Sequence, residues 1–501
     1  MKEKISNKEN IIKDTFQLTS ARYLSQVIGF FTAIGLRRFL GPFYVGIWSL
    51  LKVVMEYSSH LFLGVDKGVA YSIPLFVGGN KLKQEEEIKD AAFSFIAVAT
   101  LLISICLIIA GFLLKNTYPN ATVIGIWALA AYMILDKACT YYRTLLRAKR
   151  RFSVLSKTII FDALINLILI FTLVRFFSIY GLYATVIIVT AVNIIYMHLL
   201  AKYTVRFNFN VKVMRNLIKV GFPISIVGTL ESVLLNLDRI MIAKMIGITF
   251  VGYYSIPLMA KSYVNQLSSF GTVLYPRMLE SYGRNENIED IKKYVTVPLS
   301  INAYMLPLFL GLMFFIVPVL IEKILPKFIP GILAMQILLI DMFFRSCYPQ
   351  AFHFIIAMKK QARVIPIVVA AILLNILGNF ILIRKGYGIY GVACATSIVS
   401  FLSFVVIQSY AMKHFAGIRE IILFLIKIMA PFVYTVAVVA GLNRFIVIDN
   451  LYAQMLTRSV LLIIFSIPML YHINRETGVI KLISKTIRSN ILRKGQGTRD
   501  E

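Results

Sequence analysis

Apolar residues run along this chain in blocks of about twenty, and short polar or charged stretches separate the blocks. A helix of this length crosses the roughly 30 Å hydrocarbon layer of a membrane. The blocks lack the alternation of apolar and polar positions that is typical of a membrane barrel. The pattern therefore predicts an all-α polytopic membrane protein with about fourteen transmembrane helices, near residues 15–36, 44–65, 91–114, 122–143, 155–176, 181–201, 219–245, 250–275, 295–320, 330–357, 364–383, 388–411, 420–442 and 453–473.

The second half of the chain repeats landmarks of the first half. Leu40–Ser49 reappears as Ile246–Ser255, and Ser178–Gly181 reappears as Gly388–Gly391, at an offset of about 206 to 210 residues. Each repeat holds six predicted spans, an even number, so both repeats enter the membrane from the same side and are parallel. We expect two six-helix repeats around a central cavity plus two extra C-terminal helices. The predicted division is an N-lobe over 1–202, a C-lobe over 203–413, appended spans over 414–474 and a basic cytoplasmic tail over 475–501.

The charge distribution predicts how the chain is oriented. The net charge is +29, with 53 Lys and Arg against 24 Asp and Glu, which in a soluble protein would suggest nucleic acid. Here the basic residues gather in alternate loops, such as Arg143–Lys157 and Lys359–Arg363, as the positive-inside rule requires. We therefore predict no nucleic-acid partner and a multi-pass protein of a bacterial or archaeal cytoplasmic (inner) membrane, with both termini cytoplasmic.

Sequence signatures of catalysis are absent. The chain contains no Walker A sequence, no Rossmann glycine pattern and no zinc-binding helix signature. Its four cysteines fall in predicted spans without metal-ligand spacing. We predict that the protein is not an enzyme and needs no cofactor or metal, so that transport would draw on an ion gradient, the membrane potential or the substrate gradient.

Cations inside the predicted spans are the candidate substrate-binding residues, because a charge in hydrocarbon costs several kcal/mol unless it meets a cavity or a partner. A ladder of cations at different depths suits an anionic group that must cross the membrane. Structural alternatives remain open: an interhelical pair at Asp238 and Arg239, pairing of Lys52 with Glu56 or of Arg345 with Asp341, and snorkelling of Lys427 and Arg458. The candidates are Arg22, Lys52, Arg239, Lys261 and Arg345.

Two intramembrane acids, Glu56 and Glu231, are candidates for coupling transport to H⁺ or Na⁺. The alternative for each is a buried acid whose oxygens accept structural hydrogen bonds.

At this point the residues resemble a known family. The run Arg37–Gly46 is similar to the turn after the first helix of polysaccharide-biosynthesis flippases, and Gly221–Pro223 and Asn236–Arg239 are similar to their second-half landmarks. The chain resembles the Wzx-type O-antigen or repeat-unit flippases of the multidrug/oligosaccharidyl-lipid/polysaccharide exporter superfamily. The resemblance extends over essentially the whole chain.

The resemblance implies that an undecaprenyl-diphosphate-linked oligosaccharide moves from the inner to the outer leaflet by alternating access. It implies a cationic cavity with Arg22, Lys52, Arg239 and Lys261 at the matching positions. It also implies that spans thirteen and fourteen supply a groove for the polyprenyl tail. Membrane lipid and a polysaccharide polymerase would be further partners.

Three other functions are alternatives to this one, and the sequence fits them to different extents. A lipid II flippase shares the fourteen spans and is the nearest rival. A cation-coupled multidrug exporter of the same fold usually has twelve spans and an acid in its first helix, where this chain has Arg22. A membrane glycosyltransferase or ligase would need large outer loops with paired acids, and the predicted outer loops are only a few residues long.

Overall fold

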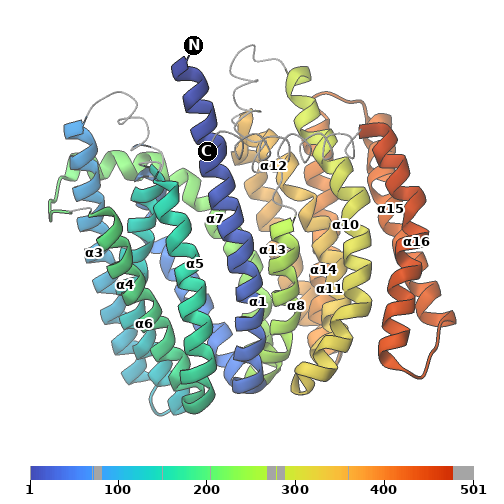
Figure 1. Cartoon of the computed structure of the whole chain (residues 1–501), viewed down its shortest axis with the longest axis horizontal. Coiled ribbons are helices and arrows are strands. Elements are labelled where there is room, and N and C mark those ends of the chain that lie inside the picture. Colours follow the sequence, from blue (N-terminus) through green and yellow to red (C-terminus); the bar gives the residue numbers. More distant parts are fainter. Residues whose placement is uncertain are drawn as a thin grey trace, which may run out of the picture. The chain divides into compact units, whose positions relative to one another are not determined.

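The residues that the computed structural model describes are almost entirely helical (Figure 1). They are 2–69, 82–148, 151–202, 205–267, 288–358 and 360–477, together with Ser72 and Met278. The predicted basic tail over 475–501 thus lies outside the described residues from position 478 onward. The chain divides into two compact units, Met1–Ser255 and Ile256–Glu501.

The first unit is built from long helices that lie side by side (Figure 1). Its elements are α1 (Lys2–Ser58), η1 (Ser59–Phe62), α3 (Leu82–Leu113), α4 (Asn120–Ala148), α5 (Phe152–Leu169), η2 (Ile170–Val174), α6 (Arg175–Ala201), α7 (Val211–Met245) and the first residues of α8 (Ile248–Leu267). Within this unit α1 packs mainly on α5, α3 packs on α4, and α4 packs on α6.

The second unit holds the remainder of α8 and the C-terminal helices. Its elements are α10 (Ile288–Ile324), η3 (Pro326–Phe328), α11 (Gly331–Ser346), α12 (Tyr348–Ala357), η4 (Gln361–Val364), α13 (Ile365–Arg384), α14 (Gly388–Met412), α15 (Ile418–Phe445) and α16 (Leu451–Thr477). Here α14 packs on α11 and α13, and α10 packs on both α15 and α16.

Two long helical segments, α1 and the continuous run from α5 through η2 to α6, each contain a break that divides the segment into two membrane passes. At about 1.5 Å per residue, a straight helix over the 57 residues of α1 would be far longer than a membrane is thick. The break falls at Gly41, where φ is 71°, directly before Pro42, which lacks the N–H that a continuous helix needs. In α6 the break falls at Ser178, where φ is 53°. Both breaks lie in the turns that the repeat analysis singled out.

The all-α membrane fold is confirmed. The number of membrane-spanning segments counted in the structure differs from the predicted number of spans. Ten helical segments of the described chain are long and apolar enough to cross a membrane, or eleven if the bent helix α7 is included. Two of these segments, Gln17–Phe62 and Phe152–Ala201, each contain two of the predicted spans. The figure of fourteen therefore stays a prediction.

The exposed surface of these helices is apolar, as expected for helices in contact with lipid. Large apolar side chains such as Leu113 and Phe176 are each 76% exposed. In the most apolar window of Phe152–Ala201, only 11% of the residues are buried inside the protein. Such helices would aggregate in water, and a hydrocarbon environment removes that cost.

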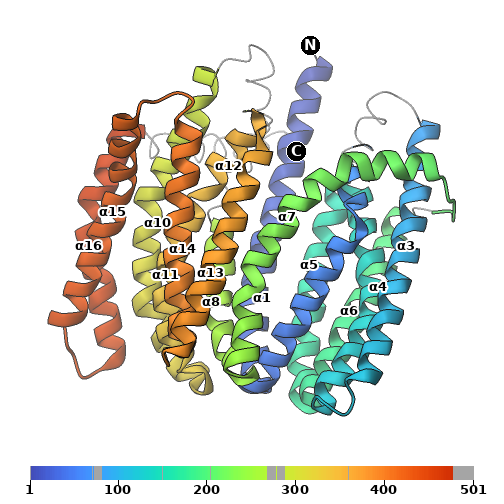
Figure 2. The same ribbon diagram turned by 180° about the vertical axis from the view of Figure 1, so that it is seen from behind.

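The boundary between the two units falls after Ser255, later than the predicted division of the repeats at 202/203. The reason is the packing of α7, which lies against α1 and α3. Figure 2 shows α7 changing direction along its length, and its two parts, Val211–Pro223 and Gly228–Met245, differ by 55°. Just before this bend, Gly221 meets the backbone of Gly64 so closely that a side chain on either glycine would clash. The first helix of the second repeat is thereby tied to the first unit.

Candidate functional site

A buried ion pair occupies the interior of the second unit. Lys261 on α8 lies with its Nζ 2.5 Å from Oδ2 of Asp341 on α11. Asp341 is completely buried, and Lys261 is only 8% exposed. Both groups lie within apolar helices, where either charge alone would cost several kcal/mol. The pair explains how each side chain is tolerated there.

Two further groups surround the same carboxylate. Arg345, one helical turn after Asp341 on α11, places its Nε 3.5 Å from Oδ1, and Ser400 on α14 donates a short hydrogen bond to that oxygen. Arg345 is partly exposed, and among the described residues its Nε has no hydrogen-bond acceptor. The single carboxylate of Asp341 therefore lies beside two cations.

The first unit contains a second group of charges, on α1 and α7. Asn236 is fully buried and donates to Oε2 of Glu56 at 2.6 Å and to the carbonyl of Ser232 at 2.9 Å. Arg239, one turn along α7, lies within electrostatic range of Glu56 and Asp238. Asp238 in turn accepts a hydrogen bond of 2.7 Å from the hydroxyl of Tyr254.

Lys52 joins this group from the α1 side. Its Nζ lies 5.4 Å from the centre of the Trp48 ring, and its side chain is within electrostatic range of Arg37, Arg239 and Glu56. The described residues contain no ion pair between Lys52 and Glu56, so the cation rests on the aromatic ring one turn before it. The group brings together three cations (Arg37, Lys52 and Arg239) and two acids (Glu56 and Asp238).

Arg37 was missed as a site residue by the sequence analysis, although it lies in the motif that carries the family resemblance. Its guanidinium donates to the carbonyl of Ser255 at 3.0 Å, to the Ser255 hydroxyl at 3.2 Å and to the carbonyl of Ala33 at 3.1 Å. It ties the end of the first pass of α1 to α8. The signal was available in its position just before the break at Gly41.

Arg22 belongs to a different part of the first unit. It is exposed on α1. Both Arg22 and Arg143 lie within electrostatic range of Arg147 on α4. Arg143 contacts Oδ1 of Asp162 on α5 at 3.6 Å, and Asn193 on α6 donates to the same oxygen at 2.7 Å. The sequence analysis treated Arg143 and Arg147 as loop charges, whereas both lie on α4.

Of the predicted substrate-binding cations, Lys52 and Arg239 thus share one group, Lys261 and Arg345 share another, and Arg22 stands in a third. Of the two predicted coupling acids, Glu56 lies in the Lys52–Arg239 group, and Glu231 lies half-buried on α7. Among the residues that the structure describes, no cluster of three or more His, Cys, Asp or Glu side chains could hold a metal ion.

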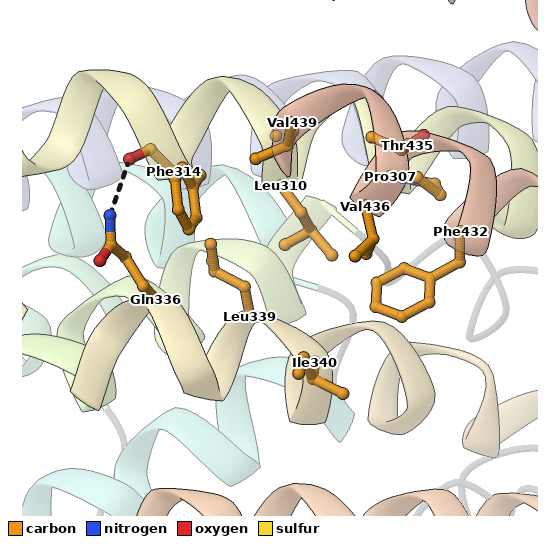
Figure 3. A pocket seen from close by; sticks show the side chains of 11 residues that line it. Pro307, Leu310, Phe314, Gln336, Leu339, Ile340, Phe432, Thr435, Val436 and Val439 are labelled. Carbon is orange, nitrogen blue, oxygen red and sulfur yellow. Dashed lines mark hydrogen bonds between the residues drawn. The ribbon is translucent and has the colours of Figure 1, made fainter. Parts of the chain in front are cut away.

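An apolar groove opens in the second unit beside the appended helices. It has a volume of about 140 Å³ and lies between α10, α11 and α15 (Figure 3). Leu310, Leu339, Phe432 and Val439 are among the side chains that point into it. We call this space the tail groove. Its two polar side chains already have partners, since Thr435 donates to the Pro431 carbonyl and Gln336 donates to the Phe314 carbonyl.

Comparison with solved structures identifies the fold as that of the MOP-superfamily transporters. An inward-facing multidrug resistance MATE transporter matches with a TM-score of 0.66 and 12% identity over 77% of this chain and 94% of that one. The lipid II flippase MurJ, in an inward closed conformation, matches with a TM-score of 0.65 and 14% identity over 91% of this chain and 99% of that one. A MOP-superfamily transporter from Pyrococcus furiosus matches with a TM-score of 0.59 and 12% identity, over 81% and 95% of the two chains.

The sequence itself assigns the family. Residues 11–281 match the model of the family described as "Polysaccharide biosynthesis protein". The chain belongs to this family, and the resemblance drawn from its motifs is confirmed. No curated protein matched the chain by sequence.

Proposed function

We propose that the protein is a flippase that moves a polyprenyl-diphosphate-linked oligosaccharide, with undecaprenyl as the lipid, from the inner to the outer leaflet of a cytoplasmic membrane. Transport would follow alternating access and would serve surface polysaccharide synthesis, without enzymatic turnover. Membership of the polysaccharide biosynthesis family supports this class of substrate, and the MOP-superfamily fold supports transport across a bilayer.

The observation that carries the proposal is the gathering of two cations around the buried carboxylate of Asp341. Lys261 and Arg345 both face this one carboxylate in the interior of the second unit. Positive charge inside a membrane protein is costly and is typical of a site that meets an anionic group. A diphosphate is the part of the substrate that hydrocarbon rejects most strongly, and a cation replaces the water that it loses.

The group around Lys52 and Arg239 supports the same chemistry in the first unit. It brings Lys52 and Arg239 close to Glu56, as two cations are brought close to Asp341 in the second unit. A diphosphate that moves across the membrane could meet cations at several depths rather than at a single site. Arg22, whose neighbours are the arginines of α4, would be the cation nearest the cytoplasmic entrance on the predicted orientation.

The tail groove supports a lipid-linked rather than a free substrate. Its lining is almost wholly apolar, and its polar side chains are satisfied within the protein. A polyprenyl chain would bury its surface there without leaving a polar group unpaired.

The test is glycan export in cells that depend on this protein for their surface polysaccharide. Lys261→Ala and Arg22→Ala should each abolish export while the protein remains in the membrane at normal abundance. Lys385→Ala, which changes an exposed lysine at the end of α13, is the matched control and should leave export intact. Normal surface glycan from both the Lys261 and Arg22 variants would overturn the proposal.

A further inference from the structure

A second, polar pocket adjoins the tail groove in the second unit. Its volume is about 160 Å³, many times the roughly 10–15 Å³ that one water needs. It shares Phe314 and Gln336 with the tail groove, so the two spaces are neighbours. Figure 3 shows these two residues together at one end of the groove, joined by a hydrogen bond. We call this second space the end pocket.

The end pocket lies at the ends of the helices, where lipid headgroups are found. Glu322 is two residues before the end of α10, Asn443 is two residues before the end of α15, and Arg458 is in the second turn of α16. Leu310 in the tail groove is twelve residues before Glu322 on α10, which corresponds to about 18 Å of helix. Lys323 lies 5.6 Å from the ring centre of the exposed Tyr452, an arrangement typical of the membrane interface.

Two opposite charges line the end pocket without neutralising each other. Glu322 and Arg458 both border it, yet the described residues contain no ion pair or hydrogen bond to the Glu322 carboxylate. Arg458 is held in place from the protein side, because its Nε donates to the Ile446 carbonyl at 3.1 Å and its Nη2 donates to the Asn443 carbonyl at 3.0 Å. These bonds satisfy the end of α15 and fix the guanidinium at the pocket wall.

Part of the guanidinium stays available to a ligand. The hydrogen-bonding neighbours of Gln454 require its side-chain amide oxygen to face Arg458. In this orientation the oxygen lies 2.6 Å from Nη2 and 3.2 Å from Nη1 of Arg458. That leaves Nη1, among the described residues, with one hydrogen that no acceptor takes. A phosphate oxygen is the acceptor that suits a guanidinium best.

We infer that the end pocket and the tail groove together bind one zwitterionic phospholipid with a primary ammonium group. Its phosphate faces Arg458, its ammonium faces Glu322, and one acyl chain lies in the tail groove. The acyl chain and the polyprenyl tail of the proposed substrate would occupy this groove in turn, not together. The inference does not rest on the proposed substrate, because the headgroup site uses none of the cations assigned to the diphosphate. On the predicted orientation the site opens to the outer leaflet.

Charge complementarity favours this lipid class over the others, although Glu322 itself is exposed. An anionic headgroup without an amine would leave Glu322 unpaired and would be repelled by it. An uncharged headgroup would leave both charges unpaired. A quaternary ammonium carries no N–H to donate to the carboxylate, so phosphoethanolamine fits the pocket better than phosphocholine.

The experiment measures lipid retention by native mass spectrometry. The purified full-length protein is placed in mixed micelles with equal amounts of phosphatidylethanolamine, phosphatidylglycerol and phosphatidylcholine. We expect the wild type to retain phosphatidylethanolamine preferentially. Glu322→Gln should lower that preference about tenfold, as expected for the loss of one charge-assisted hydrogen bond. Glu322→Lys should shift retention towards phosphatidylglycerol.

The control variant is Asp449→Asn, which removes an exposed acid of the same α15–α16 turn that does not line the pocket, and it should behave as the wild type. A phosphatidylethanolamine with a photoreactive acyl chain should also label residues of α10, α11 and α15. Unchanged lipid preference in both Glu322 variants, or labelling confined to other helices, would overturn the inference. Loss of glycan export in the Lys261 variant tests the proposed function separately.

Discussion

Gly46 and Gly252, which occupy equivalent positions in the two repeats, make the same contact in opposite directions. A β-carbon on Gly46 would lie 2.1 Å from the carbonyl oxygen of Ile248, and one on Gly252 would lie 1.9 Å from the carbonyl oxygen of Pro42. Pro42 and Ile248 are themselves equivalent in the repeat. The contact is therefore isologous, as in a symmetric dimer, although both partners belong to one chain. The two turns pack backbone to backbone because each has a glycine, which carries no side chain, at this point.

Alanine at either glycine should destabilise the protein. The added methyl group would force two backbones apart, which we expect to lower the free energy of unfolding by about 1–3 kcal/mol for Gly46→Ala and for Gly252→Ala. Gly29→Ala is the matched control, because Gly29 is also helical and has no atom within 4 Å of its β-carbon position. It should be neutral or slightly stabilising. Thermal unfolding in detergent measures all three variants, and equal midpoints for all of them would contradict the packing described.

Asp341 should be less tolerant of substitution than either of its cations. Asp341→Asn removes the buried carboxylate that both Lys261 and Arg345 contact, which should cost about 3–5 kcal/mol of stability. The double variant Lys261→Met with Asp341→Asn should recover part of that loss while remaining inactive in export. A double-mutant cycle from denaturation in mild detergent gives the coupling energy. Additive effects of the two substitutions would show that the pair does not act as a unit.

Glu56 is the acid whose charge we expect to couple transport to an ion gradient. Glu56→Gln keeps an oxygen that can accept the hydrogen bond from Asn236, so the packing of α1 on α7 should persist. The negative charge beside Lys52 and Arg239 would be lost. In proteoliposomes the variant should no longer respond to an imposed proton or sodium gradient. Asp66→Asn, at a half-buried acid that pairs with Lys67, should respond as the wild type, and an unchanged response of Glu56→Gln would exclude Glu56 as the coupling site.

Arg37 should not be replaceable by lysine. The guanidinium bonds both the carbonyl and the hydroxyl of Ser255, a forked arrangement that an ammonium group cannot reproduce. Arg37→Lys should lower the unfolding free energy by about 1–2 kcal/mol. Arg38→Lys, at the exposed neighbouring residue, should have little effect. Identical thermal midpoints of the two variants would argue against a structural bond between α1 and α8.

The fold was predictable from the sequence because apolar run length and internal repeats are local or periodic signals. Charge partners were predictable only where they lie one turn apart on one helix, as for Asp341 and Arg345. Lys52 and Glu56 have the same spacing, yet Lys52 lies over Trp48 while Glu56 accepts a bond from Asn236. The spacing of two charged residues along one helix does not show which neighbouring group each side chain contacts.

Pairs that join different helices were not accessible to the sequence analysis. Lys261 has no acid one turn away on α8, and its partner Asp341 is eighty residues further along the chain. Arg458 was expected to reach the membrane interface, and in the structure it bonds the carbonyls at the end of α15. Such contacts depend on how helices pack side by side, which a single sequence does not specify.

The most direct test of the proposed function is mass spectrometry of the lipid that co-purifies with the protein after mild detergent extraction from its native membrane. The account predicts a polyprenyl diphosphate that carries several sugars, and predicts its loss in the Lys261→Ala variant. A lipid with the pentapeptide mass of lipid II in its place would contradict the account and assign the protein to peptidoglycan synthesis.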